Sequence, residues 1–212
     1  LECVGAKIRL SEAAEKIEIR GGKFVSVSTR KSGRLEFGAC VSALPAKALA
    51  KMLPEASPFA ARIAKIKTTD IINAYFTADK KLFDGSYACL AGSPIHWIFD
   101  HTQKSRQCAA EGVRLYGATI SHARMPFDTG GIRRTLEGEV GKFFGECKIL
   151  EVLPSLFRES TISADCESEA ARPADGACGA QNLHVCGDWT ATGLPCTMES
   201  AAKSADNLTI FD

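Results

Sequence analysis

One stretch near the C-terminus, GDWTATGLPCTME at residues 187–199, carries the residue types best suited to binding a small ligand. The apolar run before it, residues 182–186, predicts a strand that ends at Gly187 and Asp188. A carboxylate at that position lies at the edge of a sheet where α/β proteins bind ligands. It can accept hydrogen bonds from ligand hydroxyls, and the glycine beside it allows close backbone approach.

A helix is predicted to begin near Thr197, after a loop shaped by Gly193 and Pro195. The free N–H groups and positive dipole end of a helix N-terminus favour an anion or an electron-rich carbonyl. The series of strand, Gly-Asp, loop and helix therefore predicts a site for a ligand with both hydroxyls and negative charge. Glu199, in the first turn, is interpreted as complementing the helix dipole rather than as a base.

The N-terminal part of the chain predicts a small antiparallel meander. Strand-like runs cover residues 6–42 and are separated by Gly21-Gly22 and by residues 31–33. A Gly-Gly pair between alternating runs is a hairpin signal. The last run becomes fully apolar at residues 39–45, as expected of a strand that enters a core.

The middle of the chain predicts helices and further strands, which together indicate an α/β (α+β) fold. Residues 165–182 are rich in Ala, Gly and Asp and are expected to form a loop. Helices are predicted at 45–53, about 57–66 and 128–147, and strands at 68–78, 87–101 (two short strands), 113–122 and on both sides of Pro154.

Composition excludes several classes of protein. The formal net charge is +1, from 26 basic and 25 acidic residues, so no global field favours nucleic acid. No apolar run approaches the ~20 residues of a membrane-spanning helix, and the N-terminus lacks the pattern of a secretion signal. Nine scattered cysteines without C-x-x-C or zinc spacing indicate free thiols, no metal site and a cytoplasmic location.

The stretch at 187–199 resembles the C-terminal flavin motif of the FAD-dependent amine oxidase and phytoene desaturase superfamily. Within it, the run is most similar to the hydroxysqualene dehydroxylase family, also described as squalene-associated FAD-dependent desaturases. The similarity extends to residues 41–54, 92–100 and 172–190. The superfamily's N-terminal Gly-x-Gly-x-x-Gly fingerprint does not occur, and the chain starts with Leu, so we expect it to be roughly the C-terminal half.

The resemblance implies FAD as the cofactor and assigns a role to each motif residue. Asp188 would bind the ribityl chain or pyrophosphate, with Gly187 giving backbone access. The Met198 amide would face the N1/O2 edge of the isoalloxazine, where a reduced flavin carries negative charge. The loop that would run past this ring comprises Leu194, Pro195, Cys196, Thr197 and Met198.

Three more positions complete the cofactor set that the resemblance implies. Ala43 and Pro45 would lie against FAD, and the backbone of Ala14 would touch its adenine. The chain also departs from the pattern, because Ser200 stands where relatives usually have Gly and Ala205 replaces a second Gly. Each departure adds bulk on a helix face that should pack closely.

The same resemblance implies three parts of the chain. Residues 1–45 would be the meander and return strand of an FAD-binding domain. Residues 46–164 would be a substrate-binding domain, built as an antiparallel sheet with helices. Residues 165–212 would supply the last FAD-binding strand, loop and helix.

Trp97 and Phe99 share one face of an alternating strand. They are either a core-facing pair or the lining of an apolar cavity for a polyprenyl chain, where aromatic faces would stabilise carbocation character. His96, Asp100 and His101 are candidates for the acid that protonates a leaving hydroxyl. For each of these three, a solvated or structural role is the alternative.

Residues 45–67 combine apolar and basic side chains at helical spacing. Such a basic amphipathic pair could rest on the cytoplasmic membrane face and admit a lipid-dissolved substrate. The alternative is a pair of ordinary helices that pack on the substrate-domain sheet. An apolar isoprenoid is the expected partner, nucleic acid is not, and no oligomeric state is predicted.

The first functional hypothesis is a flavoenzyme portion that converts hydroxysqualene to squalene in hopanoid and squalene biosynthesis. The runner-up is a carotenoid (phytoene-type) desaturase or a flavin amine oxidase. The residue before Met198 is Thr197 rather than the Tyr expected of an amine oxidase, and this difference argues against the amine oxidase hypothesis. The non-enzymatic alternative is an inactive fragment or an assembly partner.

Overall fold

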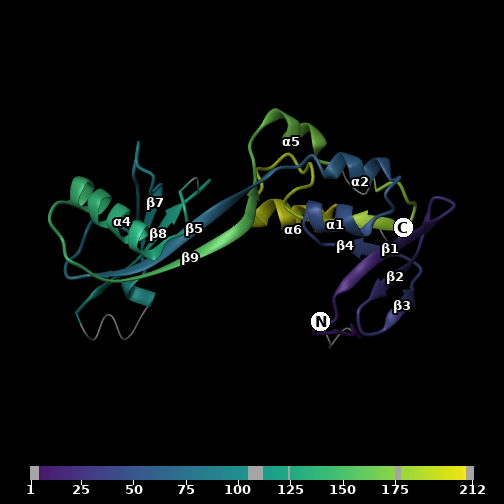
Figure 1. Cartoon of the computed structure of the whole chain (residues 1–212), viewed down its shortest axis with the longest axis horizontal. Coiled ribbons are helices and arrows are strands. Elements are labelled where there is room, and N and C mark those ends of the chain that lie inside the picture. The colour runs from purple at the N-terminus through teal and green to yellow at the C-terminus, as the bar shows by residue number, and fades with distance from the viewer. Residues whose placement is uncertain (1–4, 105–111, 124, 175–177, 209–212) are drawn as a thin grey trace. The chain divides into compact units, whose positions relative to one another are not determined.

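The computed structural model describes residues 5–104, 112–123, 125–174 and 178–208. The chain divides into two compact units (Figure 1). Unit 1 comprises residues 1–67 and 162–212, and unit 2 comprises residues 68–161. Unit 1 is therefore formed by both ends of the chain, and unit 2 by its middle.

An antiparallel meander opens unit 1, as the sequence predicts. Its strands are β1 (Ala14–Arg20), β2 (Lys23–Thr29) and β3 (Gly33–Glu36), in the order β1-β2-β3. Gly21 and Gly22, with φ of 55° and 75°, form the two-residue turn between β1 and β2. Two consecutive positive φ angles match the twist of a hairpin and favour glycine.

Two details of the expected meander are wrong. Residues 6–10 are not in a strand, and the large apolar side chains there, Ile8 and Leu10, are exposed. The last expected strand is two strands, because β3 ends at Glu36 and β4 (Cys40–Ser42) belongs to another sheet. The chain leaves the meander between them and pairs β4 with a strand from the far end of the chain.

That partner is β10 (Leu183–Val185), which runs parallel to β4. Leu183 is paired with Cys40, and Val185 with Ser42. The pairing continues past the strands, since the Cys186 N–H donates to the Ser42 carbonyl at 3.0 Å. The carboxyl ends of both strands therefore lie side by side at one edge, called the β4–β10 edge below.

Unit 1 also contains four of the described helices. Their bounds are α1 (Ala46–Met52), α2 (Pro58–Ile63), α5 (Cys166–Ala171) and α6 (Met198–Asp206). α5 lies where the sequence predicts only loop. Its N-terminus is capped by the Asp165 carboxylate, which accepts from the Ser168 N–H at 2.8 Å.

α1 and α2 belong to unit 1, whereas the sequence placed them in the substrate-binding part. The division falls after Lys67 rather than after residue 45 because the apolar faces of both helices pack in the same core as Leu183 and Val185. The large apolar side chains of this segment are all buried: Leu49, Met52, Leu53, Phe59, Ile63 and Ile66. The expected contact with a membrane face stays a prediction.

Unit 2 is built on a five-stranded sheet of order β6-β7-β8-β5-β9. The pairs β6–β7, β7–β8 and β5–β8 are antiparallel. The bounds are β5 (Thr68–Ala78), β6 (Tyr87–Cys89), β7 (Trp97–Asp100), β8 (Arg114–Ile120) and β9 (Ile149–Ile162). These strands lie where the sequence predicts them, except that β9 runs unbroken past Pro154.

One face of this sheet is covered by α4 (Thr129–Phe144), seen beside β7 and β8 in Figure 1. Ile132, Leu136 and Val140 of α4 pack in one core with sheet residues such as Phe76 and Ile98. A 3-10 turn, η2 (Thr102–Lys104), follows β7. The predicted mixed α/β fold with antiparallel sheets is thus confirmed. No helix among the described residues has the length and apolar character needed to cross a membrane.

Candidate functional site

The β4–β10 edge brings together residues that the sequence singled out separately. Ala43 and Pro45 follow β4, and both are exposed. Gly187 and Asp188 follow β10, and the Trp189 Nε1–H donates to the Leu44 carbonyl at 3.0 Å. This bond ties the two loops to each other, so four of the predicted cofactor residues share one edge.

Gly187 is required by the protein's own packing. Its φ is 148°, and a Cβ there would lie 2.7 Å from the Trp189 Nε1. Its N–H donates to the Ser204 Oγ of α6 at 2.7 Å. A larger residue would displace Trp189 and break the bond to Leu44, so the turn needs glycine even without a ligand.

Asp188 is half-buried beside the first turn of α6. Its backbone carbonyl accepts from the Ser200 Oγ–H at 3.3 Å and from Arg172 at 3.4 Å. Among the described residues, no hydrogen bond engages its carboxylate oxygens. The carboxylate is therefore held in place by its backbone and left available to accept hydrogen bonds from a ligand.

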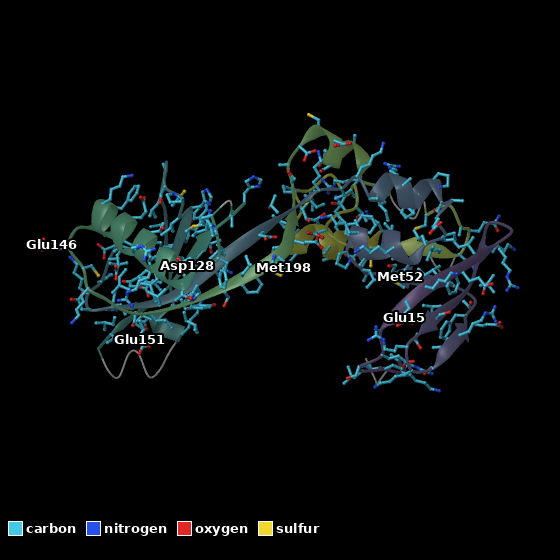
Figure 2. The ribbon with its side chains drawn as sticks, viewed as in Figure 1. Glu15, Met52, Asp128, Glu146, Glu151 and Met198 are labelled. Atoms are coloured by element: carbon cyan, nitrogen blue, oxygen red, sulfur yellow. The ribbon has the colours of Figure 1, made fainter. Side chains whose placement is uncertain are left out.

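The α6 N-terminus lacks a side-chain cap within the described part of the chain. Its N-cap residue, Thr197, is extended at φ −134° and ψ 172°, and its hydroxyl donates to the Pro195 carbonyl at 3.3 Å instead. The Met198 side chain, labelled in Figure 2, is 90% exposed. By contrast, side chains cap three other helices: Ser57, Asp128 and Asp165. The α6 tip therefore offers first-turn N–H groups and a positive dipole end to a ligand.

Two serines join α6 to the turn after β10. Ser200 is 0% exposed, and its Oγ lies 2.7 Å from the Thr192 Oγ1. Ser204 is 2% exposed, accepts from Gly187 and donates to the Ala201 carbonyl at 2.6 Å. The bulk that Ser200 adds to this close-packed face is thus accommodated by hydrogen bonds.

Arg172 is the residue of this site that sequence reasoning missed. It is 5% exposed and lies just after α5. Its guanidinium donates to the carbonyls of Thr190 at 2.6 Å and Leu194 at 3.1 Å, and pairs with Glu169 at 2.9 Å. The only signal in the sequence was the Arg-Pro pair itself, which carries no information about the carbonyls it meets.

The loop expected to run past the ligand is mostly accessible. Pro195 and Thr197 are exposed, whereas Leu194 and Cys196 are half-buried. Burial raises the pKa of the Cys196 thiol above its usual range, so it is neutral near pH 7. This loop therefore offers backbone and apolar surface rather than a reactive thiolate.

Ala14 is not brought to the β4–β10 edge by any described contact. It begins β1, pairs with Thr29 and is exposed. Its expected contact with adenine stays a prediction.

In unit 2, Trp97 and Phe99 lie on the open face of the sheet, opposite the core. They are 38% and 36% exposed, whereas Ile98 between them is 0% exposed. The core-facing reading of the pair is therefore wrong. Their rings stack at 6.3 Å between centroids, and Phe99 stacks on His101 at 6.3 Å. With two tyrosines that contact the same rings, they form the aromatic face: Tyr75, Tyr87, Trp97, Phe99 and His101.

The three candidate acids have different surroundings. The His96 Nδ1 accepts from the Ser121 N–H at 3.0 Å, and an Asp100 oxygen accepts from the Thr102 N–H at 2.8 Å, so both already serve the fold. Only His101 belongs to the aromatic face. Burial, with a smaller effect of the Lys104 charge, lowers its pKa, so it is neutral near pH 7.

His101 also lines a small hollow in the aromatic face. The hollow has a volume of about 120 Å³ and lies between His101, Tyr75, Phe99 and Gly117. A Cβ at Gly117 would lie 3.0 Å from the His101 Nε2, so glycine makes room for the imidazole. The hollow has room for a small chemical group next to the His101 imidazole.

Comparisons with known proteins point to flavin chemistry. The family described as flavin containing amine oxidoreductase matches residues 3–207. A hydroxysqualene dehydroxylase from Sinorhizobium fredii is 27% identical over 97% of this chain and 46% of that protein. One from Rhodopseudomonas palustris is 27% identical over 82% of this chain and 41% of that protein. The chain thus spans less than half the length of either relative.

Solved structures share the fold at low identity. An oxidoreductase from Methanosarcina mazei matches with a TM-score of 0.71 and 17% identity, over 97% of this chain and 50% of that chain. A reduced UDP-galactopyranose mutase matches with a TM-score of 0.55 and 9% identity, over 69% and 34%.

Proposed function

Because the chain belongs to the family of flavin-containing amine oxidoreductases, we propose that the β4–β10 edge and the α6 tip hold FAD. The observation that carries this proposal is that, among the residues the structure describes, the N-terminus of α6 has no side-chain cap and the Asp188 carboxylate beside it has no hydrogen-bond partner. These groups match two features of FAD: its ribityl chain carries hydroxyls that donate hydrogen bonds, and its pyrophosphate and the N1/O2 edge of its ring accept them.

The residues present fit this cofactor. The Asp188 carboxylate would accept from a ribityl hydroxyl, and the Met198 N–H would donate to the electron-rich edge of the ring. Exposed Ala43 and Pro45, on the neighbouring strand end, would give the flat ring an apolar surface to pack on. When bound in its reduced form, FAD supplies a hydride.

For the complete protein, we propose reductive dehydroxylation of hydroxysqualene to squalene. The two relatives named for this enzyme support the assignment. In the net conversion, the carbon–oxygen bond of the alcohol breaks, and the hydroxyl leaves as water with one proton. A hydride takes its place on carbon, so the substrate is reduced by two electrons.

The aromatic face of unit 2 is the part of the chain that would contact the substrate. Trp97 and Phe99 would bind the apolar isoprenoid, and their ring faces would lower the free energy of a developing carbocation by about 0.5–2 kcal/mol. Neutral His101, beside its hollow, would hydrogen-bond the substrate hydroxyl and orient it. Because its pKa is lowered, we assign it this orienting role rather than proton delivery.

The cofactor half of the proposal is tested on protein expressed from its complete coding sequence. We expect the purified wild type to show the absorbance of bound FAD. Asp188→Asn should weaken FAD binding by about 10- to 100-fold, as expected when one charged hydrogen-bond partner is lost. Asp206→Asn, an exposed carboxylate at the other end of α6, should leave binding unchanged. A colourless wild type that does not take up added FAD would refute the assignment.

The substrate half needs a separate assay. The reduced enzyme should convert hydroxysqualene to squalene, detected by mass spectrometry, and should leave phytoene and simple amines unchanged. Turnover of phytoene or of an amine instead would replace the proposed substrate but keep the cofactor. A protein that binds FAD and turns over none of the three would overturn the reaction as stated.

A further inference from the structure

A buried arginine lies beneath the loop that joins β10 to α6. The side chain of Arg172 is 4% exposed, and its three hydrogen-bonded carbonyls all belong to this loop. They are those of Asp188 at 3.4 Å, Thr190 at 2.6 Å and Leu194 at 3.1 Å. One guanidinium thus binds both ends and the middle of the segment from the Gly-Asp turn to the Gly-Leu-Pro loop.

The charge of Arg172 is only partly compensated. Glu169 pairs with it at 2.9 and 3.0 Å, but the Glu169 side chain is 66% exposed, so solvent screens that carboxylate. The Arg172 Nε–H is buried and has no partner among the described residues. Burying a guanidinium is costly unless its donors are satisfied, so this arrangement persists because the loop carbonyls supply most of its acceptors.

Neighbouring bonds hold Arg172 itself in place. Arg62 of α2 donates to the carbonyls of Ala171 at 3.1 Å and Arg172 at 2.5 Å. On the other side, the Ala191 N–H donates to the Pro173 carbonyl at 2.8 Å. The arginine backbone is therefore anchored to α2, and the adjoining residue is anchored to the loop.

We propose that Arg172 is a positioning residue for the cofactor site. It sets the conformation of residues 188–194, which places the Asp188 carboxylate and the α6 tip at one edge. Its buried positive charge adds to the dipole of α6 at the same loop and favours an electron-rich ligand there. Its described contacts with this loop are to backbone carbonyls, and it acts on the site through them. This inference rests on the proposed flavin site and adds the residue that assembles it.

The test compares Arg172→Gln and Arg172→Lys with a matched control. Arg133 of α4 also pairs with a glutamate, Glu137 at 2.8 Å, and donates to backbone carbonyls, those of Ile149 at 2.8 Å and Leu150 at 3.5 Å. It lies in unit 2 and is assigned no role at the site, so Arg133→Gln reports the effect of losing a similar clamp elsewhere.

The first measurement is hydrogen exchange of peptides that cover residues 188–200, which needs no bound cofactor. Arg172→Gln should speed exchange there by about 10- to 100-fold, the effect expected from losing charged hydrogen bonds. Arg133→Gln should leave these peptides unchanged. If Arg172→Gln loses protection throughout the chain, the Arg172→Lys variant is used instead. Its exchange rate should rise by about threefold or more, and only in the peptides of this loop. If the exchange rate of these peptides in Arg172→Gln, or in Arg172→Lys where that variant is used, stays within twofold of wild type, the positioning role is refuted.

The second measurement separates geometry from charge in the FAD-loaded protein. Arg172→Gln should weaken FAD binding by about tenfold or more and lower the flavin reduction potential. Arg172→Lys keeps the positive charge but lacks the planar set of guanidinium N–H donors. Its flavin reduction potential should therefore lie close to that of wild type, while its affinity for FAD should remain lower. Equal potentials for Arg172→Gln and wild type would refute the charge contribution. A colourless wild type would defeat the flavin assignment, while the exchange experiment would still decide whether Arg172 holds the loop.

Discussion

Replacing Met198 by proline removes one hydrogen-bond donor from the α6 tip and leaves the helix in place. Met198 is the first residue of α6, where the N–H has no partner inside the helix and proline is well tolerated. The residue before it, Thr197, is extended at φ −134° and ψ 172°, the conformation that proline requires of its predecessor. The matched variant Met198→Ala removes the side chain, which is 90% exposed, and keeps the N–H.

The expected size follows from the charge at the flavin edge. A backbone N–H that donates to a charged group contributes about 1.5–3 kcal/mol. The reduced flavin carries that charge and the oxidised flavin does not, so most of this contribution favours the reduced form. For a two-electron couple, about 1.4 kcal/mol corresponds to about 30 mV. Met198→Pro should therefore lower the reduction potential by about 30–65 mV.

The assay is a redox titration of the FAD-loaded protein against a reference dye, followed by the flavin absorbance. Met198→Ala should stay within about 10 mV of wild type, because it loses side-chain contacts but no donor. Circular dichroism of both variants checks that α6 is retained. A potential for Met198→Pro equal to that of Met198→Ala, with the helix intact, would show that this amide does not face the flavin and would refute the site geometry.

Three other results are expected. The pKa of Glu18 is lowered to about 2, chiefly by the Ser26 hydroxyl and then by neighbouring arginines, so its contribution to the β1–β3 sheet is present above pH 4.5 and is lost as the pH falls through about 2. Glu18→Gln should remove this part of the acid dependence of exchange in that sheet, and an unchanged profile would contradict the pairing. Burial raises the pKa of Cys178 to about 12, so iodoacetamide at pH 8 should label the exposed cysteines first, whereas equal labelling would show an open core. Ile98→Ala should lower the free energy of unfolding by about 2–5 kcal/mol. Trp97→Ala, on the open face, should cost far less stability and should instead reduce turnover of the proposed isoprenoid substrate. The reverse order of stabilities would place the core on the other face.

The elements that the sequence predicted well are those with local signals. The Gly21-Gly22 pair marks a hairpin because both residues need positive φ. The strand at 68–78 and the helix that begins at Met198 have clear β-branched and helix-start patterns. Their neighbours in space are not needed to specify them, so reading one segment at a time succeeds.

The features that the sequence did not predict depend on distant partners. β4 leaves the meander because β10, far along the chain, pairs with it. α5 was hidden in an Ala- and Gly-rich segment, although the Asp165 cap and Glu-rich first turn were available signals. Arg172 was missed because its role lies in carbonyls that only the folded loop presents. The sequence could not assign Trp97 and Phe99 to the core face or the open face for the same reason. Alternation shows that two residues share a face of the sheet, but not which face is covered by other elements.

The parallel pairing of β4 with β10 affects the order in which the chain folds during synthesis and the freedom of unit 2 to vary in sequence. During synthesis, β4 leaves the ribosome long before its neighbour exists, so the β4–β10 edge can form only after the whole of unit 2 has emerged. Unit 2 enters and leaves through β5 and β9, which are adjacent strands of its sheet. Because unit 2 is joined to the rest of the chain through two neighbouring strands, its sequence can vary without changing the pairing of β4 with β10.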